Sequence, residues 1–199
     1  MEALESLVSY GSGVDVTSAD ALEAACQVVA ALYRSPGEGL RDDLYGGRLG
    51  AVTDALAVWA GVDAPRAPHS PPAWDRLRAA YVGLFVSRAG GVPAPPYVGL
   101  VHDRELLGPR VRRLRAELAG LGIRPRAEWH ELPDHLAAVA EAVDLLMEQG
   151  RVAAATTLAV NHLVPWFDRF AEAVAQHDES GFYGELTTFL HTVLSEVAP

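Results

Sequence analysis

The stretch S-A-D-A-L-E-A-A-C-Q-V-V-A-A-L-Y-R-S, residues 18–35, decides the fold class. Its small and straight-chain residues lose little rotamer freedom in a helix. Thr17 or Ser18 can accept hydrogen bonds from the free N–H groups of the first turn, and Pro36-Gly37 closes the segment. The same helical periodicity recurs along most of the chain, while alternation of period two is nearly absent. The sequence therefore predicts an all-α protein.

The remaining helices follow from the spacing of apolar residues and from proline and glycine stops. Asp103 is expected to cap one of them, Gly150 to end another, and Pro165 to end or kink a third. No internal repeat and no change in composition marks a domain boundary. We therefore expect one single-domain bundle of roughly eight to ten helices over residues 1–199. The helices expected after the first cover residues 48–59, 73–87, 104–122, 133–150, 151–164, 166–175 and 182–194.

The charge of the chain excludes several classes of partner. The net charge is −10, and all 16 basic residues are arginine. An acidic surface repels the phosphates of nucleic acids and anionic lipids, but it attracts a cationic segment of another protein. We therefore expect no nucleic-acid partner.

Cysteine content and hydropathy narrow the class further. The single cysteine, Cys26, excludes an intrachain disulfide and a cysteine-rich metal site, and its apolar neighbours favour a small buried side chain. No segment approaches the roughly 18 consecutive apolar residues of a membrane span, and the N-terminus carries no basic leader. A cytoplasmic, soluble protein without stable membrane insertion is expected.

The stretch W-H-E-L-P-D-H-L, residues 129–136, at first looks like the helix of a zinc protease. Such a helix needs histidines four residues apart so that both face the metal. Here His135 lies five residues after His130, which turns it about 140° away on a helix. Pro133 also interrupts the turn. The geometry therefore argues against a zinc-protease site.

The same residues fit the start of a helix. Pro133 suits the first helical position, and Asp134 in the first turn meets the positive end of the helix dipole. Glu131 lies just before it. One interpretation is that these acids only cap the helix. The other is that they bind a cationic group.

Two proline segments also stand out. V-P-A-P-P-Y, residues 92–97, is held extended by its prolines, and it forms either a stiff packed loop or a docking surface with Tyr97 as its aromatic element. In N-H-L-V-P-W-F, residues 161–167, we expect His162 to bond a backbone carbonyl at the kink before Pro165, and Trp166 to fill the core.

Taken in order, these segments resemble a known family, the redox-enzyme maturation chaperones of the TorD/DmsD/NarJ group. The resemblance spans about residues 20–195 and rests on an ordered set of motifs, not on one of them. The matching motifs are Y-V-G-L-F (81–85), A-P-P-Y (94–97), R-E-L-L-G-P (104–109), E-L-P-D-H-L (131–136), H-L-V-P-W (162–166) and F-Y (182–183).

The resemblance implies an all-α chaperone that is not an enzyme and needs no cofactor. It would bind the twin-arginine leader, or the body, of a molybdopterin-containing oxidoreductase catalytic subunit in the cytoplasm until the cofactor is inserted. Such a chaperone would be a monomer or a homodimer. His162, Pro165 and Trp166 form a structural motif. The peptide-binding residues that the resemblance implies are Leu84, Phe85, Pro96, Tyr97, Gly108, Glu131, Asp134 and His135.

Two other hypotheses remain. The first is a small all-α metal-dependent hydrolase that uses His130, Glu131, Asp134 and His135. The second is a helical adaptor in which the acids only cap a helix. The chaperone hypothesis predicts no metal at these residues.

Overall fold

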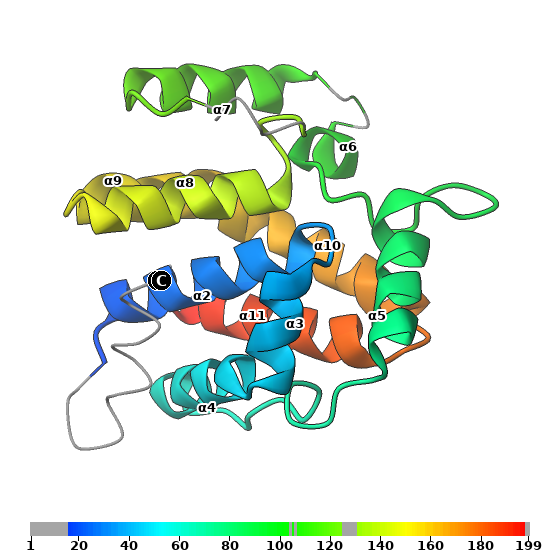
Figure 1. The fold of residues 1–199 in the computed structure, drawn as a ribbon. Helices are drawn as coiled ribbons and strands as arrows, with labels where there is room; N and C mark the ends of the chain where they lie inside the picture. The colour runs from blue at the N-terminus through cyan, green and yellow to red at the C-terminus, as the bar shows by residue number, and fades with distance from the viewer. Residues whose placement is uncertain (1–15, 104, 106, 125–130, 198–199) are drawn as a thin grey trace.

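The computed structural model describes residues 16–103, 105, 107–124 and 131–197, and these ranges contain helices and no strand (Figure 1). The expected all-α class is therefore confirmed. The elements are α2 (Ser18–Tyr33), α3 (Glu38–Tyr45), α4 (Arg48–Ala60), α5 (Trp74–Tyr81), the π-helical turn η1 (Val82–Val86), α6 (Val98–His102), α7 (Pro109–Gly120), α8 (Leu136–Glu148), α9 (Val152–Leu158), the π-helical turn η2 (Ala159–Leu163), α10 (Val164–His177) and α11 (Phe182–Val197).

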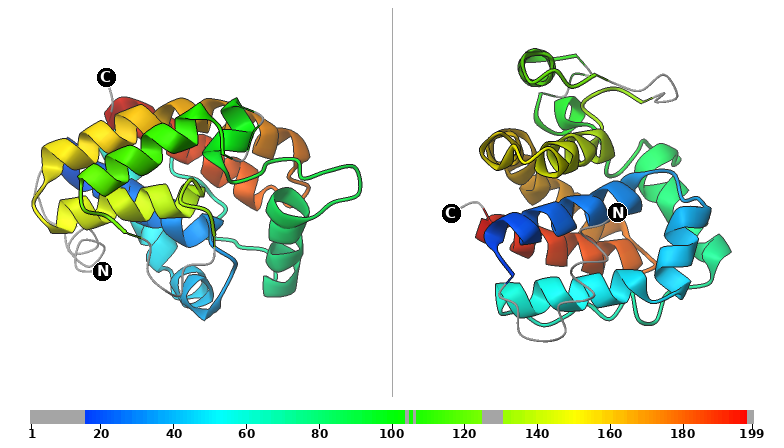
Figure 2. Two further views of the ribbon diagram at one scale, coloured as in Figure 1. Left: turned by 90° about the horizontal axis from the view of Figure 1, so that it is seen from above. Right: turned by 60° about the vertical axis from the view of Figure 1, so that its left-hand side comes forward.

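The helices stack in layers, which are clearest in the right-hand view of Figure 2. Helices α2 and α11 form the middle layer and pack against each other. Helix α4 covers one side of this pair, and α8 covers α2 on the other side. Helix α7 lies outermost, above α8 and α9, and α6 connects it to the rest of the molecule (Figure 1). The α6–α7 corner is thus an outer layer added to the central helices.

Local sequence accounts for where many helices begin and end. Thr17 caps α2 through a reciprocal pair of hydrogen bonds: the Asp20 N–H donates to Thr17 Oγ1 at 3.2 Å, and the Thr17 N–H donates to the Asp20 carboxylate at 2.9 Å. Gly150 follows α8 with a φ of 69°, a left-handed conformation that suits glycine. Both positions were expected from the sequence.

One hydrophobic core receives buried side chains from every helix in the described ranges. Aromatic rings fill its centre. Phe85 of η1 meets Tyr33 of α2 edge to face, with 5.6 Å between ring centroids, and stacks on Phe170 of α10 at 5.9 Å. The Tyr33 hydroxyl is hydrogen-bonded to Thr187 at 2.6 Å, so this buried polar group is satisfied. Cys26 is fully buried, as expected.

Two short helices, α3 and α6, were not expected from the sequence. Helix α3 buries only Leu40 and Leu44, and α6 is five residues long. Apolar patterns this short carry too little periodicity to mark a helix, because several turns are needed to distinguish one face. Both helices are therefore defined by their packing.

The expected start of the helix after Asp103 was wrong. Asp103 ends α6, and α7 begins only at Pro109 with Gly108 as its N-cap. The Asp103 carboxylate still serves α7, because it accepts a hydrogen bond from the Arg110 N–H at 3.1 Å. It reaches the first turn of α7 from across a loop.

The kink expected before Pro165 takes the form of η2, a single π-helical turn between α9 and α10. Val164 donates its N–H to the carbonyl of Ala159, five residues earlier. Pro165 has no N–H to donate to the Asn161 carbonyl four residues earlier, so a regular α-helical ladder cannot continue here. The chain adds a residue to the turn and runs on into α10.

No helix in the described ranges is both long enough and apolar enough to cross a membrane.

Candidate functional site

Two segments that are far apart in sequence meet at the base of α8. Tyr97 and His135 form an isolated antiparallel β-bridge. On either side of it, the Leu136 N–H donates to the Pro96 carbonyl at 2.9 Å and the Val98 N–H donates to the Asp134 carbonyl at 3.1 Å. Pro96 has no N–H, so its carbonyl is the only backbone group it can offer. This bridge joins the proline segment to the start of α8.

The expected helix start at Pro133 was wrong, because α8 begins at Leu136 with His135 as its N-cap. His135 Nδ1 accepts a hydrogen bond from the Ala137 N–H at 3.2 Å. The bridge to Tyr97 holds the preceding residues outside the helix. Asp134 therefore does not lie in the first turn of α8.

The Asp134 side chain instead accepts a hydrogen bond from the N-terminus of another helix, α6. Its Oδ2 accepts a hydrogen bond from the Gly99 N–H, at the N-terminus of α6, at 3.1 Å. The residue is fully buried, and its Oδ1 has no hydrogen-bond partner among the described residues. Burial raises the pKa of Asp134, while the Gly99 hydrogen bond and the positive charge of Arg115 oppose this shift.

Glu131 is the exposed acid of this cluster. The Tyr97 hydroxyl donates a hydrogen bond to its carboxylate, and the Tyr97 ring meets the edge of the His135 ring at a centroid distance of 5.2 Å. Burial raises the pKa of Tyr97, as do its hydrogen bond to Glu131 and the negative charge of that residue. A carboxylate at the surface and an aromatic ring therefore lie side by side.

His135 is held in its neutral form. Burial, followed by the positive charge of Arg34, lowers its pKa to about 4, although Glu131 acts in the opposite direction. The capping geometry agrees with this, because Nδ1 can accept the Ala137 N–H only when it carries no proton itself.

The structure brings together five of the eight sequence-predicted site residues, and it places the other three elsewhere. Leu84 and Phe85 are buried in the core, at 2% and 4% exposure, and line no open surface. Leu84 is tied to the proline segment, because its carbonyl accepts a hydrogen bond from the Ala94 N–H at 3.1 Å. Gly108 lies at the start of α7, where a Cβ would come within 2.5 Å of the Asp103 carboxylate. The residues that meet are Pro96, Tyr97, Glu131, Asp134 and His135.

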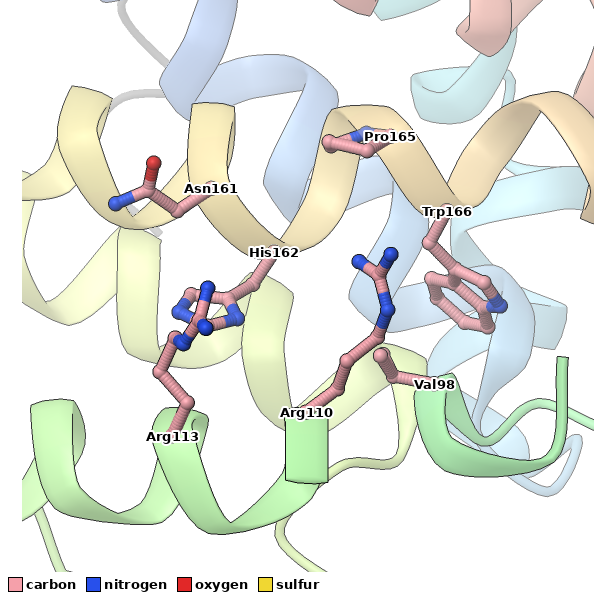
Figure 3. Close-up of a pocket in the computed structure, with 7 residues that line it drawn as sticks. All are labelled: Val98, Arg110, Arg113, Asn161, His162, Pro165 and Trp166. Carbon is pink, nitrogen blue, oxygen red and sulfur yellow. The ribbon is translucent and has the colours of Figure 1, made fainter. Parts of the chain in front are cut away.

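The H-L-V-P-W motif lines a separate hollow between α7 and the η2–α10 junction (Figure 3). His162 does not bond a backbone carbonyl as expected; its Nε2 lies 2.7 Å from the carboxylate of Glu117 on α7. Trp166 fills the core as expected, with no exposed surface. The other polar residues of this hollow were not predicted from the sequence, although arginines three apart on a helix could have indicated them. They are Arg110, Arg113 and Asn161.

No group of three or more histidine, cysteine, aspartate or glutamate residues that could hold a metal ion occurs in the part of the chain that the structure describes. His130, the first histidine of the hydrolase hypothesis, lies outside the described residues. Asp134 already binds α6, and His135 already caps α8.

Comparisons with known proteins show which family of proteins this chain resembles. A sequence model of the nitrate reductase delta subunit family matches residues 48–172. A relative from Salmonella typhi, described as a Tat proofreading chaperone DmsD, is 30% identical over 146 residues, which cover 72% of this chain and 68% of the relative. A relative of the same description from Salmonella typhimurium strain LT2 is 28% identical over the same shares of both chains.

A solved structure from Archaeoglobus fulgidus, described as a candidate redox enzyme maturation protein, superposes with a TM-score of 0.61 at 17% identity and covers 87% of this chain and 93% of its own. The fold is therefore that of a helical redox-enzyme maturation protein. The chain belongs to the nitrate reductase delta subunit family of maturation chaperones, as the resemblance in its motifs predicted. The comparisons give no support to the hydrolase hypothesis.

Proposed function

We propose that this protein binds the twin-arginine leader of a molybdopterin-containing oxidoreductase catalytic subunit in the cytoplasm and releases it unchanged after cofactor insertion. Family membership and the description of its relatives as Tat proofreading chaperones support this function. One observation carries the choice of site: an exposed carboxylate, Glu131, is hydrogen-bonded to an aromatic side chain, Tyr97, at the bridge between the proline segment and α8.

The arginine pair of the leader carries positive charge, which complements the negative charge of Glu131. A guanidinium group can donate two parallel hydrogen bonds to a carboxylate, which makes Glu131 the direct acceptor in our proposal. Asp134 is fully buried, so in this proposal it makes no direct contact with the leader and supports the site from within. The net charge of −10 speeds the encounter with a cationic peptide at low salt.

The buried members of the predicted set act in this proposal by positioning the others. His135 fixes the start of α8, and Asp134 fixes the start of α6, so that Glu131 and Tyr97 face each other. The half-buried Tyr97 ring offers an apolar contact to the residues that follow the arginine pair. Leu84 and Phe85 support the site from within the core.

The test is a calorimetric titration of the protein with the synthetic twin-arginine leader of the molybdopterin oxidoreductase encoded nearest to it. We expect micromolar binding to the wild type. Glu131→Gln should weaken binding at least about tenfold, because it removes a charge-assisted hydrogen bond. A leader with both arginines replaced by lysine should also bind more weakly, because lysine cannot match the two carboxylate oxygens.

The matched control is Glu148→Gln, which removes the same charge from an exposed position at the opposite end of α8. It should leave the affinity within about twofold, since exposed charges this far apart are largely screened. Equal weakening by both substitutions would reduce the effect to net charge and reject Glu131 as the site. A wild type that binds no leader at tens of micromolar would reject the proposed function.

A further inference from the structure

The hollow between α7 and the η2–α10 junction is lined by two arginines, by other polar side chains and by the apolar Val98 and Pro165. It holds about 310 Å³ of empty space, part of it open to solvent. In Figure 3 the side chains of Arg110 and Arg113 extend from α7 toward the helix that carries His162 and Pro165. Asn161 adds an amide that can donate, and Trp166 adds part of its indole ring, whose N–H is itself buried. A site with this lining is complementary to an anion.

The positive charge at this place contrasts with the rest of the chain. Helix α7 contains four arginines and one acid, a net charge of +3 in a chain whose net charge is −10. Arg113 makes no ion pair with any residue that the structure describes, and Arg110 is held only loosely, with its Nε 3.6 Å from Asp103 Oδ1. Guanidinium groups three residues apart on a helix repel each other until an anion lies between them.

The base of the hollow is formed by buried side chains, so the site is more than a group of arginines on the surface. His162 is only 6% exposed, and the Glu117 carboxylate fixes its ring through Nε2. The indole N–H of Trp166 is buried and has no partner among the described residues. The π-helical turn η2 presents Asn161 and His162 beside the arginines, and turns of this kind occur frequently at functional sites.

We propose that this hollow binds an oxyanion of the phosphate class, gripped by the guanidinium groups of Arg110 and Arg113 and by the Asn161 amide. Arginine forks match the spacing of two oxygens on one phosphorus or carbon atom, so phosphate and carboxylate share this chemistry. The hollow lies between two helices (Figure 3), which suits one or two such groups on a small molecule better than an extended acidic segment. The Glu117 carboxylate, which His162 holds by a hydrogen bond, brings one negative charge beside the hollow, against the two positive charges of Arg110 and Arg113.

The test is a calorimetric titration of the full-length protein with inorganic phosphate and, separately, with diphosphate, at an ionic strength held constant with sodium chloride. We expect saturable binding of one ion per chain, with diphosphate the tighter because its two phosphate groups can engage both arginines. Arg113→Gln should weaken diphosphate binding at least about tenfold through the loss of charge-assisted hydrogen bonds. A hexaglutamate peptide distinguishes a small phosphate from an acidic protein segment, and it should not compete.

Arg112→Gln is the matched control, because it makes the same charge change on the same helix while its guanidinium group bonds the Leu107 carbonyl. It should keep the wild-type affinity within about twofold. The proposal is overturned if neither ion saturates the protein, if hexaglutamate displaces diphosphate, or if Arg112→Gln weakens binding as much as Arg113→Gln. Glu131→Gln should not affect diphosphate binding, so the outcome is independent of leader recognition.

Discussion

His135 shows how one side chain can join two parts of the molecule. Its backbone forms the bridge to Tyr97, its ring meets the Tyr97 ring, and its Nδ1 caps α8. The cap requires a neutral imidazole, because Nδ1 must carry no proton to accept the Ala137 N–H. Protonation would turn the capping acceptor into a donor that faces the Ala137 N–H.

We therefore expect His135 to destabilise the fold in acid. Because its pKa is lowered to about 4, the unfolded chain binds a proton between pH 6.5 and 4 that the folded chain does not. The contribution of His135 to the free energy of unfolding is fully present above pH 6.5. It is lost as the pH falls from 6.5 to 4, and the loss is roughly 3 kcal/mol at most. Urea unfolding at pH 7 and pH 4 measures this loss.

His135→Asn is the matched variant, since asparagine is a good N-cap that does not titrate. The free energy of unfolding of the wild type should fall more steeply with acid than that of the variant, and the effects of the other acids cancel in the difference. Parallel profiles would mean that His135 is not held neutral.

At the scale of the element, the α6–α7 corner depends on a glycine. A Cβ built on Gly99 would lie 2.4 Å from the Glu105 carbonyl oxygen and 2.8 Å from a methyl group of Val111 on α7. The Gly99 N–H also donates a hydrogen bond to the Asp134 carboxylate. The absence of a side chain therefore lets α6 approach both the loop before α7 and the start of α8.

Gly99→Ala should destabilise the protein by about 1–3 kcal/mol, because the added methyl group forces backbone and side chain apart. Gly83 in η1 offers the control, since a Cβ there meets nothing within 4 Å, and Gly83→Ala should be neutral or slightly stabilising. Thermal unfolding of the two variants measures the difference. Equal melting temperatures would show that the corner yields without cost.

At the scale of the whole molecule, one core joins all of the described helices. Helix α7, although outermost, buries Val111, Leu114 and Leu118. Leu114 and Leu118 belong to the same cluster as the aromatic centre around Tyr33 and Phe85. A shared core makes the layers depend on one another.

We therefore expect one cooperative unfolding transition, consistent with a single domain. Far-UV circular dichroism and tryptophan fluorescence should give the same midpoint in urea. Two separate transitions would mean that the outer α6–α7 layer unfolds separately from the central helices. The single-domain prediction would then be wrong.

The sequence by itself determined the all-α class, the cap at Thr17, the stop at Gly150 and the interruption at Pro165, because each depends on interactions within a few residues. It also placed Glu131 just before a helix, but it put Asp134 and His135 inside the first turn, whereas α8 begins at Leu136. Only the tertiary structure decided which helix Asp134 serves, because its partner, Gly99, lies 35 residues away. It likewise decided that Leu84 and Phe85 are core residues and that Arg113 of α7 lies beside His162 of η2. Local patterns fix helices, but burial and long-range partners are fixed only when the helices pack.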